Sequence, residues 1–285
     1  MIIPAYRAGT TLPLVLRALE PQVAAEDREV LLIDSTGEAG EARQSVSWPW
    51  LREVHLPERV LPGRARNLGA SLARGELLAF LDADAVPAAD WLDQLTCAIS
   101  PEIEMVVGAV LDGTPDDRWG TVAYMLEFLD WLPDQQRTPR YGASCNLLVR
   151  RSAFERAGGF PEDLWPGEDT VFSAPFGVSG TLLFTPDARV VHLNRVGRRA
   201  VLSHQRRLGA AWVEVCTRVP LRSSRLTRPS LVPVAIAMRV WITTRRLLGQ
   251  PGGPRRVIKH GVRLIIGSLA WGVGAASASR ARVGR

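Results

Sequence analysis

Short apolar runs alternate with segments of helical spacing over the first hundred residues. Continuous apolar runs bounded by polar residues are typical of strands that are buried on both faces of a parallel sheet. Between them, apolar side chains recur at helical spacing over 12–19 and 65–73. Strands that alternate with helices predict βαβ units and a mostly parallel sheet with helices on its faces. The four expected strands lie at 1–3, 29–33, 54–56 and 77–81.

The middle of the chain continues as a mixture of strands and helices. Ser152 and Glu155 have the spacing of a capping box, which indicates that a helix begins there. No internal repeat of fixed period is present in the sequence. The other expected elements are a helix at 119–131, strands at 105–110 and 143–150, and a short apolar end-piece at 190–192.

The last sixty residues have a different pattern. Residues 231–248 are apolar but interrupted by arginines, and two prolines and two glycines break the chain at 251–254. Residues 264–278 carry no charge, but this run is shorter than the roughly 20 residues that span a bilayer. We therefore expect two interfacial or re-entrant helices, the alternative being two core helices of a soluble domain. The expected domains are residues 1–225, with halves at about 1–100 and 101–225, and a membrane-associating segment at 226–285.

Charge is distributed unevenly along a chain of otherwise ordinary globular composition, 46% hydrophobic and 22% charged. Residues 1–194 contain 16 basic and 28 acidic residues, a net charge of −12, whereas 195–285 contain 19 basic and one acidic residue, a net charge of +18. Such a basic segment fits anionic lipid, nucleic acid or a phosphate-bearing substrate. Long apolar runs between the arginines favour lipid over nucleic acid.

Cysteine content and the N-terminal residues bear on the compartment. Three widely spaced cysteines fit no zinc or disulfide pattern, which favours a reducing environment. The first residues lack the basic and apolar regions of a signal peptide. We therefore expect the folded protein at the cytoplasmic face of the cell membrane.

Asp82 and Asp84 directly follow the apolar run at 77–81. Ligands of open α/β sheets bind outside the carboxyl ends of the strands, where two such carboxylates can share one cation. Mg²⁺ and Mn²⁺ prefer oxygen ligands, and a bound metal neutralises charge on a departing nucleoside diphosphate. The alternative is a polar strand end without a metal.

The surrounding residues resemble the family 2 glycosyltransferases, which have the GT-A fold and use nucleotide sugars. An Ala-Arg-Asn-x-Gly helix at 65–69, the hydrophobic strand, the Asp-x-Asp and a following Pro and Trp-Leu carry the resemblance. It extends to Ile2-Ile3-Pro4-Ala5-Tyr6, Leu32-Ile33-Asp34, 143–151, Gly158-Gly159-Phe160 and Gly167-Glu168-Asp169. It thus covers roughly residues 1–210.

This resemblance implies a role for each matching residue. The catalytic residues become Asp169, as the base, and Glu168, and inverting transfer does need a carboxylate that accepts the proton of the acceptor hydroxyl. The alternative is a pair of acids at a helix N-terminus, which the macrodipole favours. The metal ligands become Asp82, Asp84 and His192, although a lone histidine at a strand end can equally be a packed residue. The nucleotide-sugar-binding residues become Pro4, Tyr6, Asp34, Arg66, Asn67, Asp82 and Arg206.

Three departures from the family pattern bear on which nucleotide is bound and on whether transfer is processive. Ser35 replaces the usual second aspartate after the second strand, and Arg7 replaces the usual asparagine. Gln205 is not followed by the Gln-x-x-Arg-Trp motif of processive synthases, which argues for single transfer. The predicted function is inverting, non-processive transfer from a UDP-, GDP- or dTDP-sugar to a lipid-linked or cell-envelope acceptor, with Mg²⁺ or Mn²⁺ as cofactor. An inactive membrane scaffold and a basic binding module are the alternatives.

Overall fold

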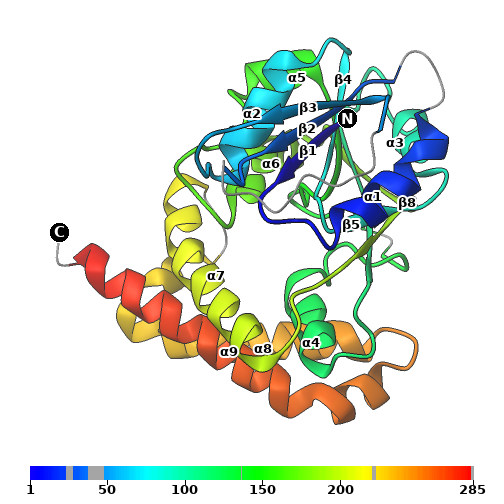
Figure 1. The fold of residues 1–285 in the computed structure, drawn as a ribbon. Helices are drawn as coiled ribbons and strands as arrows, with labels where there is room; N and C mark the ends of the chain where they lie inside the picture. The colour runs from blue at the N-terminus through cyan, green and yellow to red at the C-terminus, as the bar shows by residue number, and fades with distance from the viewer. Residues whose placement is uncertain (24–27, 38–47, 136, 220–222, 284–285) are drawn as a thin grey trace. The chain divides into compact units, whose positions relative to one another are not determined.

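Strands and helices alternate along the first half of the chain, and helices alone make up its end (Figure 1). The computed structural model describes residues 1–23, 28–37, 48–135, 137–219 and 223–283. In chain order the elements are β1 (Ile2–Ala5), α1 (Leu12–Leu19), the 3₁₀ turn η1 (Glu20–Gln22), β2 (Val30–Asp34), β3 (Leu51–His55), α2 (Pro62–Leu72), β4 (Leu77–Leu81), β5 (Ala85–Pro87), α3 (Trp91–Cys97), β6 (Met105–Asp112), α4 (Arg118–Glu127), β7 (Asn146–Arg150), α5 (Arg151–Arg156), α6 (Glu168–Ser179), β8 (Leu182–His192), α7 (Arg198–Arg218), η2 (Ser224–Thr227), η3 (Pro229–Leu231), α8 (Val232–Leu248) and α9 (Gly253–Val283).

The chain divides into two compact units, each continuous in space but not in sequence. The first contains Met1–Leu111 and Gln135–Leu193, and the second contains Asp112–Asp134 and Asn194–Arg285. The helices after residue 226 therefore belong to the same unit as α4 and α7. The functional division expected at residue 225 stays a prediction.

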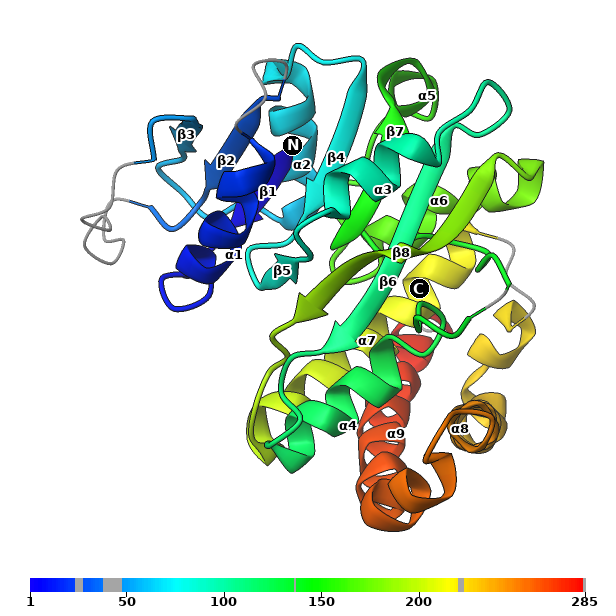
Figure 2. The ribbon, with the colours of Figure 1, turned by 90° about the vertical axis from the view of Figure 1, so that its right-hand side faces the viewer.

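The first unit contains a mixed sheet. Its eight strands among the described residues follow the order β3-β2-β1-β4-β7-β6-β8-β5, and the part from β3 to β7 can be followed from left to right in Figure 2. Strands β3, β2, β1 and β4 are parallel neighbours, as the βαβ pattern predicts. The pairs β4–β7, β6–β7 and β5–β8 are antiparallel. Strands β6 and β8 run in the same direction, because the backbone N of Met105 at the start of β6 donates to Thr181 O just before β8.

Helices cover both faces of this sheet. In Figures 1 and 2, α1 and α3 lie on one face and α2 and α6 on the other. Helix α2 packs closely because Gly69 has no side chain: a Cβ there would lie 2.4 Å from Ile2 Cγ2. Phe80 of β4 forms an aromatic cluster on this side with Phe154, Phe160 and Phe172, whose ring centroids lie 4.3–6.0 Å apart.

Asn146 joins the strands at the centre of the sheet. Its fully buried amide nitrogen donates to the carbonyl oxygens of Ala109 and Ala188, both at 2.9 Å, and its oxygen accepts from Trp91 Nε1 at 2.8 Å. A buried amide with every partner satisfied fixes the relative positions of β6, β7, β8 and α3.

The second unit consists of helices α4, α7, α8 and α9, which lie side by side in both views. Asp117 begins α4 by accepting hydrogen bonds from the backbone N–H groups of Trp119 and Gly120. The apolar centre of the unit contains Val213, Val232, Ala235, Trp271 and Ala275. Polar groups are also buried there: Gln205 donates to Glu127 at 2.8 Å and accepts from Arg239 at 2.8 Å.

Helices α7 and α9 touch backbone to backbone. A Cβ at Gly209 would lie 1.8 Å from the carbonyl oxygen of Trp271, and a Cβ at Gly274 would lie 1.8 Å from that of Arg206. No side chain fits at either position, so these glycines permit the contact.

Several boundaries differ from those expected from the sequence. Helix α9 begins at Gly253 rather than near 264, because basic residues interrupt its apolar pattern without interrupting the helix. Strand β8 runs from Leu182, although the sequence indicated only its last three residues, because polar residues and Pro186 interrupt the strand after Phe184. The other two C-terminal elements agree well: α8 occupies Val232–Leu248, and the chain turns near 251–252.

Candidate active site

Asp82, Asp84 and His192 come together at the carboxyl end of β4. The pairing of β5 with β8 places His192 opposite Ala85, directly beside Asp84. A backbone hydrogen bond of 2.8 Å from Leu193 N to the Asp84 carbonyl oxygen holds the two segments together. One ligand atom from each of the three side chains lies within 4.8 Å of the others, and His192 Nε2 lies 3.5 Å from Asp84 Oδ1.

These three side chains fit a divalent cation. Two carboxylates and one imidazole supply oxygen and nitrogen ligands of the kind that Mn²⁺ accepts, and carboxylates also suit Mg²⁺. Asp82 and Asp84 are partly accessible, which leaves room for phosphate oxygens, whereas His192 is buried. The three predicted metal ligands are therefore brought together.

Arg66 links this cluster to the start of α6. Its guanidinium donates to Asp82 Oδ1 at 2.7 Å and to Glu168 Oε1 at 2.8 Å. The side chains of Arg66 and Glu168 are only 3% and 5% exposed. Burial opposes the Arg66 charge, but the carboxylates of Asp82 and Glu168 outweigh this and raise the pKa of the guanidinium. Arg66 is thus a fixed cation held between two parts of the site.

Asp169 occupies the first turn of α6. Gly167, with a φ of 103°, turns the chain immediately before the helix, a conformation that glycine adopts without strain. The Asp169 carboxylate accepts from Thr170 N at 2.7 Å and from Ser144 N at 3.5 Å. Burial raises the pKa of this carboxyl, although Arg66 opposes the shift.

Glu168 has a perturbed pKa as well. Burial raises the pKa of its carboxyl to about 7, with the charge of Asp169 adding to the shift and that of Arg66 opposing it. The two neighbouring acids differ in their contacts: Glu168 pairs with Arg66, whereas Asp169 accepts from backbone N–H groups and from the Thr170 hydroxyl.

Cys145 shows that the metal cluster and Asp169 share one neighbourhood. Burial raises the pKa of its thiol well above the usual range, and the charges of Asp82, Asp84 and Asp169 all add to this shift. Cys145, in the turn before β7, is therefore close enough to all three carboxylates for their charges to act on it. Cys145 is not among the site residues predicted from the sequence, and the small residues around it are the only local signal that could have indicated it.

Tyr6 and Asp34 lie at the ends of the neighbouring strands β1 and β2. Asp34 Oδ1 accepts from Thr36 N at 3.0 Å, and His55 Nδ1 lies 3.6 Å from Asp34 Oδ2. Tyr6 is half-exposed, and the Arg59 guanidinium lies 4.5 Å from its ring centroid. The strand pairing brings these residues together, and neither His55 nor Arg59 stands out in the sequence.

Two positions that depart from the family pattern, Ser35 and Arg7, lie beside β1. Pro4 lies within β1, opposite Ile33. Ser35 is buried and donates from its backbone N to the Ala5 carbonyl oxygen at 2.9 Å, so it joins β2 to β1. Arg7 adopts a φ of 51° and donates from its backbone N to Thr36 Oγ1 at 3.0 Å.

Two residues predicted to bind the nucleotide sugar, Asn67 and Arg206, lie away from the carboxylate cluster in their contacts or in their unit. The Asn67 amide donates to the Phe160 carbonyl oxygen and to Glu162 Oε1, both at 2.9 Å, and accepts from Phe160 N at 2.9 Å. It thereby holds the Gly-Gly-Phe segment against α2. Arg206 belongs to α7 in the second unit, where it lines a hollow described below.

Comparisons with known proteins identify the family. Residues 1–158 match the profile of Glycosyl transferase family 2. Glycosyltransferase AglE of Haloferax volcanii is 30% identical over 224 residues, which cover 75% of this chain and 73% of that protein. Another curated relative is much longer, and the match covers 38% of its length.

Solved structures share the fold. The mannosyltransferase PcManGT of Pyrobaculum calidifontis, in complex with GDP-Man and Mn²⁺, superposes with a TM-score of 0.52 at 18% identity, covering 99% of this chain and 74% of that one. TarS of S. aureus, residues 1–349 in complex with UDP-GlcNAc, gives a TM-score of 0.52 at 14% identity, covering 99% and 91%. The GT-A fold implied by the sequence resemblance is confirmed, and the chain belongs to glycosyltransferase family 2.

Proposed function

We propose that this protein transfers a sugar from a nucleoside-diphosphate donor to an acceptor hydroxyl, once per encounter and with inversion at the anomeric carbon. The observation that carries the proposal is the pair of hydrogen bonds from Arg66 to Asp82 and Glu168, which connects the Asp82, Asp84 and His192 cluster to the first turn of α6, where Asp169 lies. A proton acceptor and a phosphate-binding site are thus supplied within one neighbourhood.

Asp169 is the proposed base. A carboxylate with a raised pKa takes a proton from a hydroxyl more readily than an ordinary aspartate does. In the proposed step the acceptor oxygen attacks the anomeric carbon, the bond to the diphosphate oxygen breaks, and the hydroxyl proton passes to Asp169. The short hydrogen bond from Thr170 N holds the carboxylate in place.

Glu168 and Arg66 act as positioning residues in this proposal. Their ion pair attaches the first turn of α6 to Asp82, so that the base and the metal ligands keep a fixed separation. Glu168 was grouped with the catalytic residues on sequence grounds, and its contact with Arg66 supports an indirect role.

The donor is proposed to bind across the carboxyl ends of β1, β2 and β4. Asp82, Asp84 and His192 would hold Mg²⁺ or Mn²⁺, which when bound supplies positive charge to the diphosphate leaving group. Tyr6 and Asp34 are proposed to contact the nucleoside, with Pro4 shaping the strand end and Asn67 holding the segment beside Arg66. The two solved structures contain GDP-Man and UDP-GlcNAc, so they support a nucleotide sugar without selecting its base.

The acceptor is proposed to be a lipid-linked or cell-envelope glycan at the cytoplasmic face of the membrane. The net charge of +18 over residues 195–285 supports an anionic surface as partner. Among the described residues, one helix, Gly253–Arg282, has the length and mean hydropathy, 1.3, that a membrane-crossing helix needs.

Thermal stabilisation by donors tests this function. The full chain is heated with UDP-, GDP- and dTDP-sugars, with and without Mn²⁺. A ligand present at a hundred times its Kd stabilises the folded state by about 2.7 kcal/mol, which shifts the unfolding midpoint measurably. We expect one nucleotide class to stabilise the wild type with Mn²⁺ and to lose this effect in Asp84→Ala.

Sugar transfer in Asp169→Asn separates binding from chemistry. This variant should keep the metal-dependent stabilisation and lose about 10²- to 10⁴-fold in transfer rate, because only the proton acceptor is removed. Asp187→Asn, an exposed change on β8, is the matched control. Wild-type transfer by Asp169→Asn would disprove the base assignment, and a folded wild type that no donor stabilises would favour the inactive scaffold.

A further inference from the structure

The outer face of α9 is apolar although it is exposed to solvent. Its large exposed side chains recur every three or four residues, which places them on one side of the helix. We call this set the apolar stripe of α9: Ile258, Val262, Ile265, Leu269 and Val273, with exposed fractions between 47% and 85%. Soluble proteins rarely leave such a continuous apolar face uncovered.

The opposite face of α9 is already occupied. Leu264, Trp271 and Ala275 are buried, the last two in the apolar centre of the second unit. The packing of the second unit therefore does not use the stripe, and only a partner outside this unit could bury the stripe.

Basic residues frame the apolar stripe. Arg255, Arg256 and Lys259 precede or flank its first residue, and Arg280 and Arg282 follow its last. Helix α9 contains no acidic residue. An apolar face with cations at both ends is complementary to a bilayer whose headgroups are anionic.

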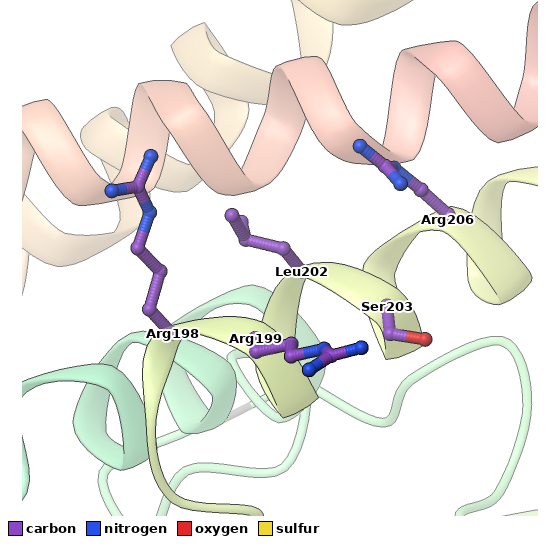
Figure 3. A pocket seen from close by; sticks show the side chains of 5 residues that line it. All are labelled: Arg198, Arg199, Leu202, Ser203 and Arg206. Carbon is purple, nitrogen blue, oxygen red and sulfur yellow. The ribbon is translucent and has the colours of Figure 1, made fainter.

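An arginine-lined hollow lies on α7. It has a volume of about 430 Å³ and is lined by Arg198, Arg199, Leu202, Ser203 and Arg206. Figure 3 shows Arg198 and Arg206 extending from α7 on the side where α9 passes. Gly274 of α9 packs on the backbone of Arg206, so the two helices touch beside the hollow.

We propose that the apolar stripe of α9 docks on an anionic phospholipid bilayer, and that the arginines of the α7 hollow add to the attraction for its phosphates. The stripe enters the boundary between headgroups and acyl chains, while the guanidinium groups bind lipid phosphates. The inference goes beyond sugar transfer and does not rest on the proposed donor chemistry.

Helix α9 lies in the plane of the membrane on this surface. If α9 crossed the bilayer instead, its contact at Gly274 would carry Arg206 into the hydrocarbon, together with Arg263 of α9 itself. Arginine at that depth is strongly disfavoured. The length and hydropathy of α9 allow crossing, but the packing of α7 against it favours the interfacial position.

Vesicle flotation tests the proposal with the full chain. Phosphatidylcholine vesicles are compared with vesicles in which part of the lipid is phosphatidylglycerol. We expect the wild type to prefer the anionic vesicles and to be released from them by alkaline carbonate. Ile265→Ser/Leu269→Ser/Val273→Ser should weaken partitioning about 100-fold, because half-exposed apolar side chains would no longer enter the membrane.

The charge contribution is tested separately. Arg198→Gln/Arg199→Gln should weaken binding to anionic vesicles about 30-fold and leave binding to phosphatidylcholine unchanged. Val178→Ser on α6 and Arg17→Gln on α1 are matched controls, since both positions are exposed and belong to the first unit. Each variant is also checked for its unfolding midpoint and for metal-dependent stabilisation by donors, which separates loss of docking from loss of fold or of donor binding.

Any one of four outcomes would overturn the inference. The first is that the triple serine variant, shown to be folded, binds vesicles as the wild type does. The second and third are that the wild type binds both vesicle types equally, or binds DNA in place of vesicles. The fourth is that the wild type resists carbonate extraction, which would mean that α9 spans the bilayer.

Discussion

Arg66 offers a test of the electrostatics of the site through stability alone. Arg66→Met removes a buried guanidinium and leaves the Glu168 carboxylate, 5% exposed, without its counter-charge. Asp82 is 27% exposed and can be rehydrated, so Glu168 carries most of the penalty. Breaking a buried ion pair from one side typically costs about 3–5 kcal/mol.

The pH dependence follows from the pKa of Glu168, which burial raises to about 7 in the wild type. A folded-state pKa above the unfolded one means that the folded state binds the proton more tightly. Stability from this group is therefore present at low pH and is lost as pH rises toward 7. Without Arg66 the pKa rises further, so the loss continues above pH 7, by up to about tenfold in the folding equilibrium constant per pH unit. The stability gap between wild type and Arg66→Met should therefore be about 1 kcal/mol larger at pH 8 than at pH 6.

Urea unfolding followed by circular dichroism at pH 6, 7 and 8 measures this gap. The comparison variant is Arg66→Met/Glu168→Gln, which removes the stranded charge while keeping the side-chain volume. It should be more stable than Arg66→Met at pH 8, with Asp169 accounting for the remaining pH dependence. A gap of equal size at pH 6 and 8, or a double variant no more stable than the single one at pH 8, would refute the reasoning.

Further predictions concern packing, the sheet and the base. Gly274→Ala should destabilise the protein by about 1–3 kcal/mol or more, because its Cβ would lie 1.8 Å from the Arg206 carbonyl oxygen. Gly261→Ala, in the same helix and with open space around it, should be neutral or stabilising; both are read from urea midpoints. Asn146→Leu should cost at least about 3 kcal/mol by the same assay, because one indole N–H and two carbonyls lose their partner. The turnover rate with saturating donor should fall on the acid side with a midpoint above about 3.9, the ordinary aspartate pKa, and a limb at that value would contradict the raised pKa of Asp169.

Local patterns were enough for much of the first unit. Strands β2 and β4 are continuous apolar runs, and their carboxyl ends carry Asp34 and Asp82 as a parallel sheet predicts. The partner of Asp84 was harder to predict from local patterns, because His192 reaches it only through the pairing of β5 with β8, more than a hundred residues apart. The family resemblance named His192, whereas its own surroundings did not.

Long-range pairings account for what the sequence did not reveal. Arg66 was expected on the donor side, and nothing local indicates that it joins Asp82 to Glu168. The antiparallel pairs of β7 also depend on distant partners, because β7 inserts between β4 and β6. Likewise, residues 112–134 join the C-terminal helices in one unit, a grouping that the order of the residues along the chain does not suggest.

The backbone contact between α7 and α9 has a practical consequence for producing this protein. Deleting the residues from 253 onward is an obvious way to seek a more soluble enzyme, because it removes the exposed apolar side chains of α9. It would also strip Trp271 and Ala275 from the core and uncover Gly209, Trp212 and Val213 of α7. Such a truncated chain should aggregate more readily, whereas serine substitutions confined to the outer face of α9 should improve solubility and keep the unit folded.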